Sequence, residues 1–408
     1  MKIILRNGKL ITPLKIIHKG GIMIENGKIV SIFKDEDDFN HYRADRIIDV
    51  GGCFISPGFI DIHTHGAGGY DFMDGDVKSI KEACKTHMKY GTTTIVPTTL
   101  TSTMEELFSV LDNFKQAKAE IKDGPNILGL HLEGPYLSIE QKGAQDPLYI
   151  KNPDKQEYLK ILNYSNDIIR WTVAPELDGA LEMGNILREK GILGSIGHTN
   201  AIYQEVLAAY ENGFTHITHL YSGMSMVRRI NAFRYAGVVE SAYLIDEMTV
   251  EIIADGKHLP ASLLKLVYKI KGADKICLVT DSMRAAGMPD GEYILGSLKV
   301  GQKVVVEDGV AKLIDRSAFA GSVATTNLLV KTMKNLAEIP IHEAVKMVTL
   351  TPARVMGIDN KKGSLAIGKD ADIVVFDENI NVLMVLVRGD IRINNIGQSY
   401  TNKKTLRL

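Results

Sequence analysis

Residues 59–65 read Phe59-Ile60-Asp61-Ile62-His63-Thr64-His65, an apolar run that ends in two histidines separated by one residue. On a β-strand, residues i and i+2 point to the same side, so both imidazoles can face one metal ion. In a chain with 11 histidines such a pair alone proves little. It gains weight because further side chains able to bind metal recur at the ends of later strand-like runs.

Seven more apolar runs of strand length follow between residues 93 and 280, and amphipathic segments separate them. The eight runs are Phe59–His63, Thr93–Pro97, Leu128–Leu132, Trp171–Ala174, Leu193–Ile196, Thr215–Thr218, Val250–Ala254 and Ile276–Thr280. Segments with helical spacing include Val77–Tyr90, Glu105–Lys118, Gly179–Lys190, Tyr203–Asn212 and Pro260–Ile270. Eight buried strands that alternate with helices predict an α/β fold, a (β/α)8 TIM-type barrel.

Polar side chains follow every one of these predicted strands. They are His63 and His65, Thr98 and Thr99, Glu133, Glu176, His198, His219, Asp255 with His258, and Asp281. Active sites of such barrels lie at the carboxyl ends of the strands. The sequence therefore predicts one active site that gathers these residues.

The two ends of the chain resemble each other and differ from the centre. Residues 1–55 contain short alternating strands with Asn7-Gly8 and Asn26-Gly27, dipeptides typical of hairpin turns. Alternation returns after residue 362 and includes a final Arg-Gly turn. We expect residues 1–55 and 363–408 to form a small β-sandwich domain, and residues 56–362 to form the catalytic barrel.

The composition is that of an ordinary globular protein, with 45% hydrophobic and 24% charged residues among 408. A formal net charge of −1 argues against a nucleic-acid partner or an anionic membrane surface. No apolar stretch of about 18 residues occurs, and the N-terminal segment predicts no signal peptide. Cys53, Cys84 and Cys277 are scattered, so we expect no disulfide framework and a cytoplasmic protein.

Five of the strand-end residues form a set of nitrogen and carboxylate donors suited to a metal ion: His63, His65, Glu133, His198 and His219. Such donors fit Zn²⁺ or Fe²⁺. A carboxylate such as that of Glu133 can bridge two ions. We therefore expect a divalent metal, Zn²⁺ or Fe²⁺, with one or two ions per chain.

Asp281, at the end of the eighth predicted strand, is the candidate general base. An aspartate beside metal-activated water can take its proton and return it to the leaving group. The alternative is a helix cap. Asp255 and His258 can contact substrate at the mouth, although Asp255 also suits a tight Asp-Gly turn. Together these residues predict metal-assisted hydrolysis of a C–N or similar bond.

The remaining histidines are interpreted as structural. His131 points opposite to Leu130 and Leu132 within its strand, so it could line the barrel or the site, and we interpret it as structural. His216 lies three residues before His219, so period-2 geometry places the two on opposite faces and His216 behind the barrel. We assign no site role to the others, His18, His41, His87 and His342.

Several motifs resemble a known family. Ser56–Gly66 resembles the entry motif of the amidohydrolase superfamily. Six further segments are similar to the N-acetylglucosamine-6-phosphate deacetylases of that superfamily: His131–Tyr136, Gly197–Asn200, Thr218–Tyr221, Ala254–His258, Val279–Asp281 and Ala320–Ser322. The resemblance spans nearly the whole chain.

The resemblance implies a homodimeric barrel enzyme that removes acetate from a small-molecule acetamido sugar phosphate, in amino-sugar metabolism. It assigns Glu133, His198 and His219 to a principal metal, and His63 and His65 to a second ion kept by some members. Asp281 would be the base and then the acid. The implied sugar site comprises Ala144, Ser222, Gly223, His258, Phe319, Ala320 and Gly321.

The chain departs from the family pattern at three places, all concerned with substrate recognition. Gln145 stands where the family commonly has histidine, and Ser222-Gly223 replaces Asn-Ala. The segment that carries the phosphate-binding arginine is longer here. Arg234 matches that arginine best because Gly237 then aligns with the motif's glycine, while Arg228 and Arg229 are rivals, and all three could simply be solvated.

Three other functions stay open at this point. The chain could deacetylate another acetamido sugar, such as N-acetylgalactosamine-6-phosphate or an unphosphorylated sugar. It could be a different amidohydrolase, acting on a cyclic amide or an acyl-amino acid, although cyclic amidases use a strand-end lysine where this chain has Glu133 and Glu176. It could also be an inactive relative that serves in binding or assembly, although such relatives usually lose metal ligands.

Overall fold

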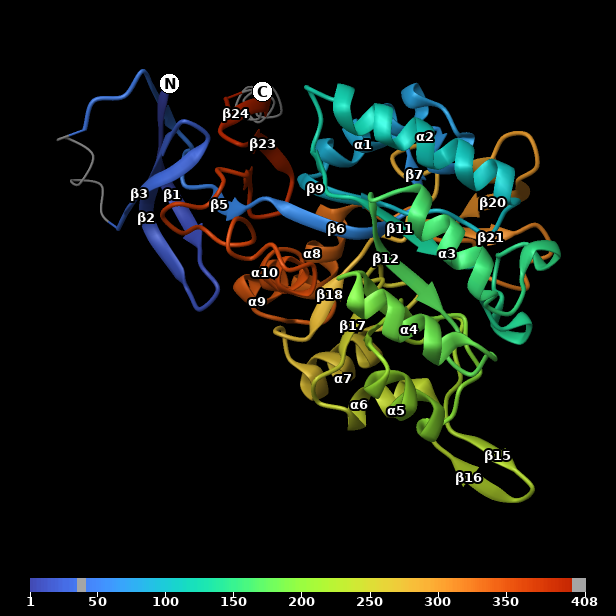
Figure 1. Ribbon diagram of the computed structural model, residues 1–408. Coiled ribbons are helices and arrows are strands. Elements are labelled where there is room, and N and C mark those ends of the chain that lie inside the picture. Colours follow the sequence, from blue (N-terminus) through green and yellow to red (C-terminus); the bar gives the residue numbers. More distant parts are fainter. Residues whose placement is uncertain (35–41, 398–408) are drawn as a thin grey trace.

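A computed structural model describes residues 1–34 and 42–397 of the chain (Figure 1). His41, which we expect to be structural, lies outside the described residues, as do the last residues of the predicted terminal domain, 398–408.

The central region is built on parallel strands arranged in two sheets that curl, with helices on the outer side (Figure 1). One sheet contains, in order, β11 (Leu130–Glu133), β12 (Ile168–Val173), β13 (Leu193–Ile196), β14 (Phe214–Ile217), β17 (Thr249–Ile252) and β18 (Ile276–Leu278). The other contains β10 (Asn126–Ile127), β9 (Thr92–Pro97) and β6 (Phe59–Thr64). Each of the eight predicted runs overlaps one of these strands.

Backbone hydrogen bonds connect the two sheets at the carboxyl ends of their strands. The amide of Thr99, after β9, donates to the carbonyl of His131 in β11 at 3.0 Å. The amide of Asp281, after β18, donates to the carbonyl of His63 in β6 at 2.9 Å. The strand ends that carry the predicted site residues are therefore fixed relative to one another.

Each of the five predicted helical segments overlaps a helix of the structure, and the structure has further helices. The helices are α1 (Val77–Lys89), α2 (Met104–Glu120), α3 (Lys155–Tyr164), α4 (Ala180–Glu189), α5 (Tyr203–Glu211), α6 (Val238–Leu244), α7 (Ala261–Lys271), α8 (Thr326–Asn335), α9 (Ile341–Met347) and α10 (Leu350–Val355). The predicted segments correspond to α1, α2, α4, α5 and α7. Asp76 and Thr103 cap α1 and α2 by accepting amide hydrogen bonds. None of the helices in the described part of the chain is long and apolar enough to cross a membrane.

Both ends of the chain contribute to a separate sheet of eight strands. Its order is β24-β23-β22-β5-β1-β2-β3, and β4 pairs with β1 off this path. The strands are β1 (Lys2–Ile11), β2 (Ile16–Glu25), β3 (Lys28–Phe33), β4 (Arg46–Asp49), β5 (Phe54–Pro57), β22 (Ile373–Phe376), β23 (Val382–Val387) and β24 (Asp390–Asn394). Strand β5 leads directly into β6 and so joins this sheet to the central region (Figure 1).

Two of the three predicted turns of this sheet are hairpins. Asn26-Gly27, with φ of 51° and 76°, joins β2 to β3, and Arg388-Gly389, with φ of 49° and 78°, joins β23 to β24. The prediction for Asn7-Gly8 is wrong, because β1 continues through this dipeptide as an irregularity in its pairing with β2. A Cβ atom on Gly8 would lie 2.5 Å from Ile55 Cδ1, so close packing explains the glycine.

Shorter elements not singled out in the sequence complete the fold. An antiparallel sheet of β19 (Gly291–Leu295), β20 (Gln302–Glu307) and β21 (Val310–Leu313) follows β18. Arg284 donates to the carbonyl of Ile294 at 2.6 Å and to Asp74 at 2.8 Å, which ties this sheet to the loop after β6. The other pieces are β7 (Gly66–Ala67), β8 (Tyr70–Asp71), η2 (Phe72–Asp74), η3 (Ile139–Gln141), η4 (Pro147–Tyr149) and the hairpin of β15 (Arg228–Ile230) and β16 (Phe233–Tyr235).

His87 has the structural role expected of it. It lies on α1, is buried, and its Nε2 is 2.9 Å from Thr64 Oγ1 and 3.2 Å from the carbonyl oxygen of Gly66. Burial lowers the pKa of His87 to about 4. The folded protein therefore holds this imidazole neutral.

The buried His87 makes stability depend on pH. The unfolded chain protonates this ring below its ordinary pKa of about 6.5, so between pH 6.5 and 4 the unfolded state binds more protons and stability falls with pH. We expect the unfolding free energy of chelator-treated wild type to fall by roughly 3 kcal/mol more than that of His87→Gln between pH 7 and pH 4. Urea unfolding at the two pH values measures this difference, and equal losses in both proteins would contradict it.

Candidate active site

Three of the predicted site residues have a left-handed backbone, which directs their side chains toward one point. His198, His219 and Asp281 follow β13, β14 and β18 with φ of 48°, 24° and 46°. A non-glycine residue in this region is strained by on the order of 1–3 kcal/mol. Such strain is typical of functional sites, where the surrounding structure holds the residue in place.

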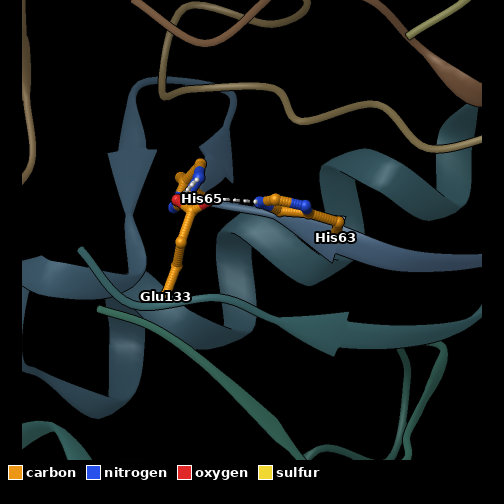
Figure 2. Close-up of side chains that lie close together, drawn as sticks. All are labelled: His63, His65 and Glu133. Atoms are coloured by element: carbon orange, nitrogen blue, oxygen red, sulfur yellow. Dashed lines mark ion pairs between the residues drawn. The ribbon is translucent and has the colours of Figure 1, made fainter. Parts of the chain in front are cut away.

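Glu133, the last residue of β11, lies at the centre of the cluster. Its Oε1 is 3.1 Å from His219 Nε2, 3.3 Å from His198 Nε2 and 3.5 Å from His63 Nε2. Its Oε2 is 3.3 Å from His65 Nε2. Figure 2 shows the rings of His63 and His65 directed toward this carboxylate. All five residues predicted as metal ligands are thus brought together.

Asp281 lies on the side of the cluster formed by β6. Its Oδ1 is 3.3 Å from His63 Nε2 and 3.1 Å from His65 Nε2. Burial opposes ionisation, but the rings of His63 and His65 outweigh it and hold the pKa of Asp281 below its ordinary value. The carboxylate is therefore ionised at neutral pH and able to accept a proton.

Three of the four imidazoles are oriented through Nδ1. In His198 this atom is 2.8 Å from the carbonyl oxygen of Gln141, and in His219 it is 3.1 Å from that of Ser222. In His63 it is 3.1 Å from Glu251 Oε2. A carbonyl or carboxylate oxygen can only accept a hydrogen bond, so Nδ1 carries a proton and, in the neutral ring, Nε2 presents a lone pair to the cluster.

These lone pairs fit a divalent cation. His198 Nε2 and His219 Nε2 are only 3.2 Å apart, and the buried His63 Nε2 has no hydrogen-bond partner in the described part of the chain. Two lone pairs that face each other at this distance need a positive charge between them. Ligand atoms within 4.8 Å of one another form two groups, His63–His65–Glu133 and Glu133–His198–His219. Imidazole and carboxylate donors suit zinc and iron.

The charge of the cluster supports the same interpretation. Burial disfavours the protonated rings, yet Asp281 and Glu133 outweigh it and raise the pKa of His63 to about 10 and that of His65 to about 9. The two carboxylates thus create a potential that favours positive charge. A divalent ion can supply this charge in place of protons.

A cavity of about 300 Å³ opens above the cluster. Six of the predicted substrate-binding residues line it: Ala144, Ser222, Gly223, His258, Phe319 and Gly321. The predicted base Asp281 and all predicted metal ligands except His63 also line it: His65, Glu133, His198 and His219. His258 and Phe319 face each other across 4.7 Å between ring centroids. The cavity is large enough for a small molecule in contact with the cluster.

Three predicted substrate-binding residues do not line this cavity. Asp255 instead accepts from His258 Nδ1, with 2.7 Å between Oδ2 and the ring nitrogen. Ala320 is fully buried among apolar side chains. Arg234 lies exposed on the β15–β16 hairpin, which projects from the molecule (Figure 1), and its guanidinium donates to the carbonyl of Ala232.

The structure adds residues that were not among the predicted catalytic, metal-binding or substrate-binding residues. The cavity is also lined by Leu100, Gly143, Gln145, Tyr221, Leu295 and Ala318. Gln145 donates to Glu133 Oε2 at 2.8 Å. Below the cluster lie Glu251 and Arg170, both fully buried. In the sequence, Glu251 lies within an apolar run and Arg170 lies directly before one. A charged side chain buried at such a position needs a partner of opposite charge, and this could have indicated both residues.

The expectation for His131 is confirmed and that for His216 is wrong. His131 is buried between Thr98 and Thr172, with ring nitrogens 3.1 Å and 2.7 Å from their hydroxyls. His216 Nε2 lies 3.5 Å from Glu251 Oε1, on the same side of the sheet as the ligand cluster. The backbone at His219 is left-handed, with φ of 24°, so this residue does not continue the alternation of side chains along β14. His219 therefore points to the same side as His216.

Comparison with known proteins agrees with this geometry. A family model described as "Amidohydrolase family" matches residues 54–392. An N-acetylglucosamine-6-phosphate deacetylase of Lysinibacillus sphaericus is 33% identical over 96% of this chain and 98% of its own. An N-acetylgalactosamine-6-phosphate deacetylase of Escherichia coli O157:H7 is 30% identical over 83% of this chain and 87% of its own.

A solved structure matches the whole fold. The crystal structure of N-acetylglucosamine-6-phosphate deacetylase from Pasteurella multocida superposes with a TM-score of 0.88 at 31% identity, covering 97% of this chain and 100% of the other. The fold described above is therefore shared with that crystal structure.

Gly321 provides a test of the strained backbone at the site. Its φ is 64°, and an added Cβ would lie 2.8 Å from the carbonyl oxygen of Asp281. Gly357 has a similar φ of 67° with nothing within 4 Å, so it is the matched control. We expect Gly357→Ala to cost about 1 kcal/mol of unfolding free energy with unchanged hydrolysis. Gly321→Ala should cost more and slow turnover at least tenfold, and equal effects of the two would contradict this account.

Proposed function

This chain belongs to the amidohydrolase family and is a hydrolytic enzyme, and we propose that it hydrolyses the acetamido group of N-acetylglucosamine-6-phosphate to glucosamine-6-phosphate and acetate. The observation that carries the proposal is the cluster of four histidines around Glu133, with Asp281 beside it at the base of the cavity. The relatives that carry this activity in their names match nearly the full chain.

The metal ligands divide into two groups that share one carboxylate. Glu133, His198 and His219 would hold one ion, and His63 and His65 with Glu133 would hold a second. Zn²⁺ and Fe²⁺ both suit these donors. When bound, such an ion lowers the pKa of water from 15.7 to about 7 and polarises a carbonyl group.

Asp281 would move the proton during hydrolysis. It accepts a proton from water as the water oxygen bonds to the acetyl carbonyl carbon, and it returns that proton to the sugar nitrogen as the C–N bond breaks. Acetate and the free amine result. The ionised state of Asp281 and its place beside the cavity support this role.

The substrate would lie in the cavity with its acetamido group toward Glu133. His258 donates through Nδ1 to Asp255, which leaves its Nε2 able to accept from a sugar hydroxyl. Phe319, packed beside His258, gives an apolar surface for the sugar ring. Backbone and side-chain groups of Ala144, Ser222, Gly223 and Gly321 complete the proposed contacts.

The homodimer belongs to the same proposal. Phe233 on the β15–β16 hairpin is 71% exposed, and Val227, immediately before β15, is 57% exposed. This apolar area is suited to a second copy of this chain. Arg234 on this hairpin lies outside the cavity of its own chain, so its proposed contact with the sugar phosphate would have to come from a partner subunit.

Finer features of the fold and the location are also proposals. We infer that the central strands close into a complete (β/α)8 barrel, which the Asp281–His63 and Thr99–His131 backbone hydrogen bonds support. We further infer that the terminal sheet folds as a β-sandwich domain from residues 1–55 and 363–408, with the catalytic domain at 56–362. A cytoplasmic location remains the expectation from the scattered cysteines.

One alternative substrate has a specific observation in its favour. The relative from E. coli O157:H7 is named for N-acetylgalactosamine-6-phosphate, the galacto epimer, and is 30% identical to this chain. Ser222-Gly223 and Gln145, where the chain departs from the family pattern, lie at the cavity and can change the choice of sugar. Cyclic amides are less favoured because the described residues that line the cavity include no lysine.

Asp281→Asn tests the proton transfer. The amide keeps the shape of the side chain but cannot accept the proton, so we expect kcat to fall by roughly 10²–10⁴-fold while substrate affinity changes little. Steady-state acetate release from metal-loaded protein measures both parameters. Wild-type kcat in the variant would remove Asp281 from the mechanism.

The choice of sugar is tested by comparing three substrates in the same acetate assay. We expect the kcat/KM for N-acetylglucosamine-6-phosphate to be at least tenfold above those for N-acetylgalactosamine-6-phosphate and unphosphorylated N-acetylglucosamine. Faster turnover of the galacto epimer would assign the alternative. Equal turnover of the unphosphorylated sugar would show that no arginine binds phosphate.

A further inference from the structure

A buried ion pair lies directly beneath the ligand cluster. Glu251 in β17 and Arg170 in β12 are both fully buried, and Arg170 Nη1 donates to Glu251 Oε1. Neither lines the cavity, so neither can touch substrate. Such a pair is seldom retained for stability alone, since well-packed apolar residues often stabilise as much.

Glu251 contacts two of the proposed metal ligands with one oxygen. Its Oε2 accepts from His63 Nδ1 at 3.1 Å and from the backbone amide of His219 at 3.3 Å. His63 belongs to one metal group and His219 to the other. The carboxylate therefore fixes the ring of one ligand and the backbone of the second.

Arg170 holds Glu251 in place and contacts the residues next to the same ligands. It donates to the carbonyl of Ile62 at 3.1 Å, which precedes His63, and to Thr218 Oγ1 at 2.9 Å, which precedes His219. Its Nε donates to Ser195 Oγ at 3.0 Å. The rigid guanidinium thus sets the positions of four strands against one another.

Among the four histidine ligands, His63 differs in being held through Nδ1 by a charged side chain. His198 and His219 are oriented by backbone carbonyl groups, and the buried Nδ1 of His65 has no hydrogen-bond partner among residues 1–34 and 42–397. Only the ring of His63 is oriented by an ionised side chain. A substitution of Glu251 should therefore affect the two metal groups unequally.

We propose that Glu251, held by Arg170, is a positioning residue that fixes the tautomer and orientation of His63 for the ion bound by His63, His65 and Glu133. The carboxylate accepts a hydrogen bond from Nδ1, which keeps the proton there and leaves Nε2 free to bind the metal. Loss of such an outer contact typically costs 10–100-fold in metal affinity. The inference rests on the proposed metal-dependent function and adds a residue to it.

The test is a Zn²⁺ titration of chelator-treated protein against a chromophoric chelator. His63→Ala identifies the site that depends on His63. We expect Glu251→Gln to weaken Zn²⁺ binding at that site by 10–100-fold, and to weaken the Glu133–His198–His219 site by less than threefold. Excess Zn²⁺ should restore turnover in Glu251→Gln, which a merely misfolded variant would not show.

Asp372→Asn is the matched control. Asp372 is also a buried carboxylate paired with a cation, Lys362, but it lies at the terminal sheet and touches no ligand. This variant should lose stability and keep both Zn²⁺ affinities. If Glu251→Gln fails to fold because Arg170 is left unpaired, the double variant Arg170→Met/Glu251→Gln removes both charges and carries the same expectation.

Two results overturn the inference. One is a folded Glu251 variant whose Zn²⁺ affinity is not lowered selectively at the His63-dependent site, because it is unchanged there or falls equally at both sites. The other is a wild-type protein that binds no ion through His63. Acetate release by the wild type is measured separately, so failure of the proposed function is distinguished from failure of this inference.

Discussion

The carboxylate of Glu133 lies within 3.5 Å of four imidazole nitrogens, and the rest of the site is arranged around this one group. No short segment of chain could deliver four rings to one carboxylate. Parallel strands can, because their carboxyl ends meet at the same edge of a curled sheet. At three of these ends a residue with left-handed backbone turns its side chain toward the cluster. The backbone strain at these residues is the free-energy cost of bringing their side chains together.

The cluster depends in turn on charges buried below it. Glu251 and Arg170 are removed from water and compensate each other, and removing one partner of such a pair typically costs about 3–5 kcal/mol. Their hydrogen bonds reach His63, His219 and the residues before them. The site therefore has three layers. The Glu251–Arg170 ion pair, whose charges cancel, lies lowest, the proposed metal ligands lie above it, and the cavity where hydrolysis is proposed lies above them.

The central strands and the ligand set could be predicted from sequence because each rests on a local signal. Apolar runs marked the strands, and His63, His65, Glu133, His198 and His219 stood at their ends. The side of the sheet reached by His216 could not be predicted, since the turn at His219 depends on contacts with other strands. Glu251 was visible only as a charge inside an apolar run, and its partner Arg170 lies 81 residues away. Leu295 at the end of β19 and Ala318 in the loop after β21 line the cavity, and no local pattern in the sequence indicates that they reach it.

Anomalous diffraction from crystals of the active, metal-loaded enzyme tests the central role of Glu133 most directly. We expect a peak within about 2.0–2.2 Å of a Glu133 oxygen, from an ion that is also bonded to Nε2 of His198 and of His219. A second peak, where present, should lie on the side of His63 and His65 and share the same carboxylate. Crystals of active enzyme whose metal peaks lie away from Glu133 would contradict the account.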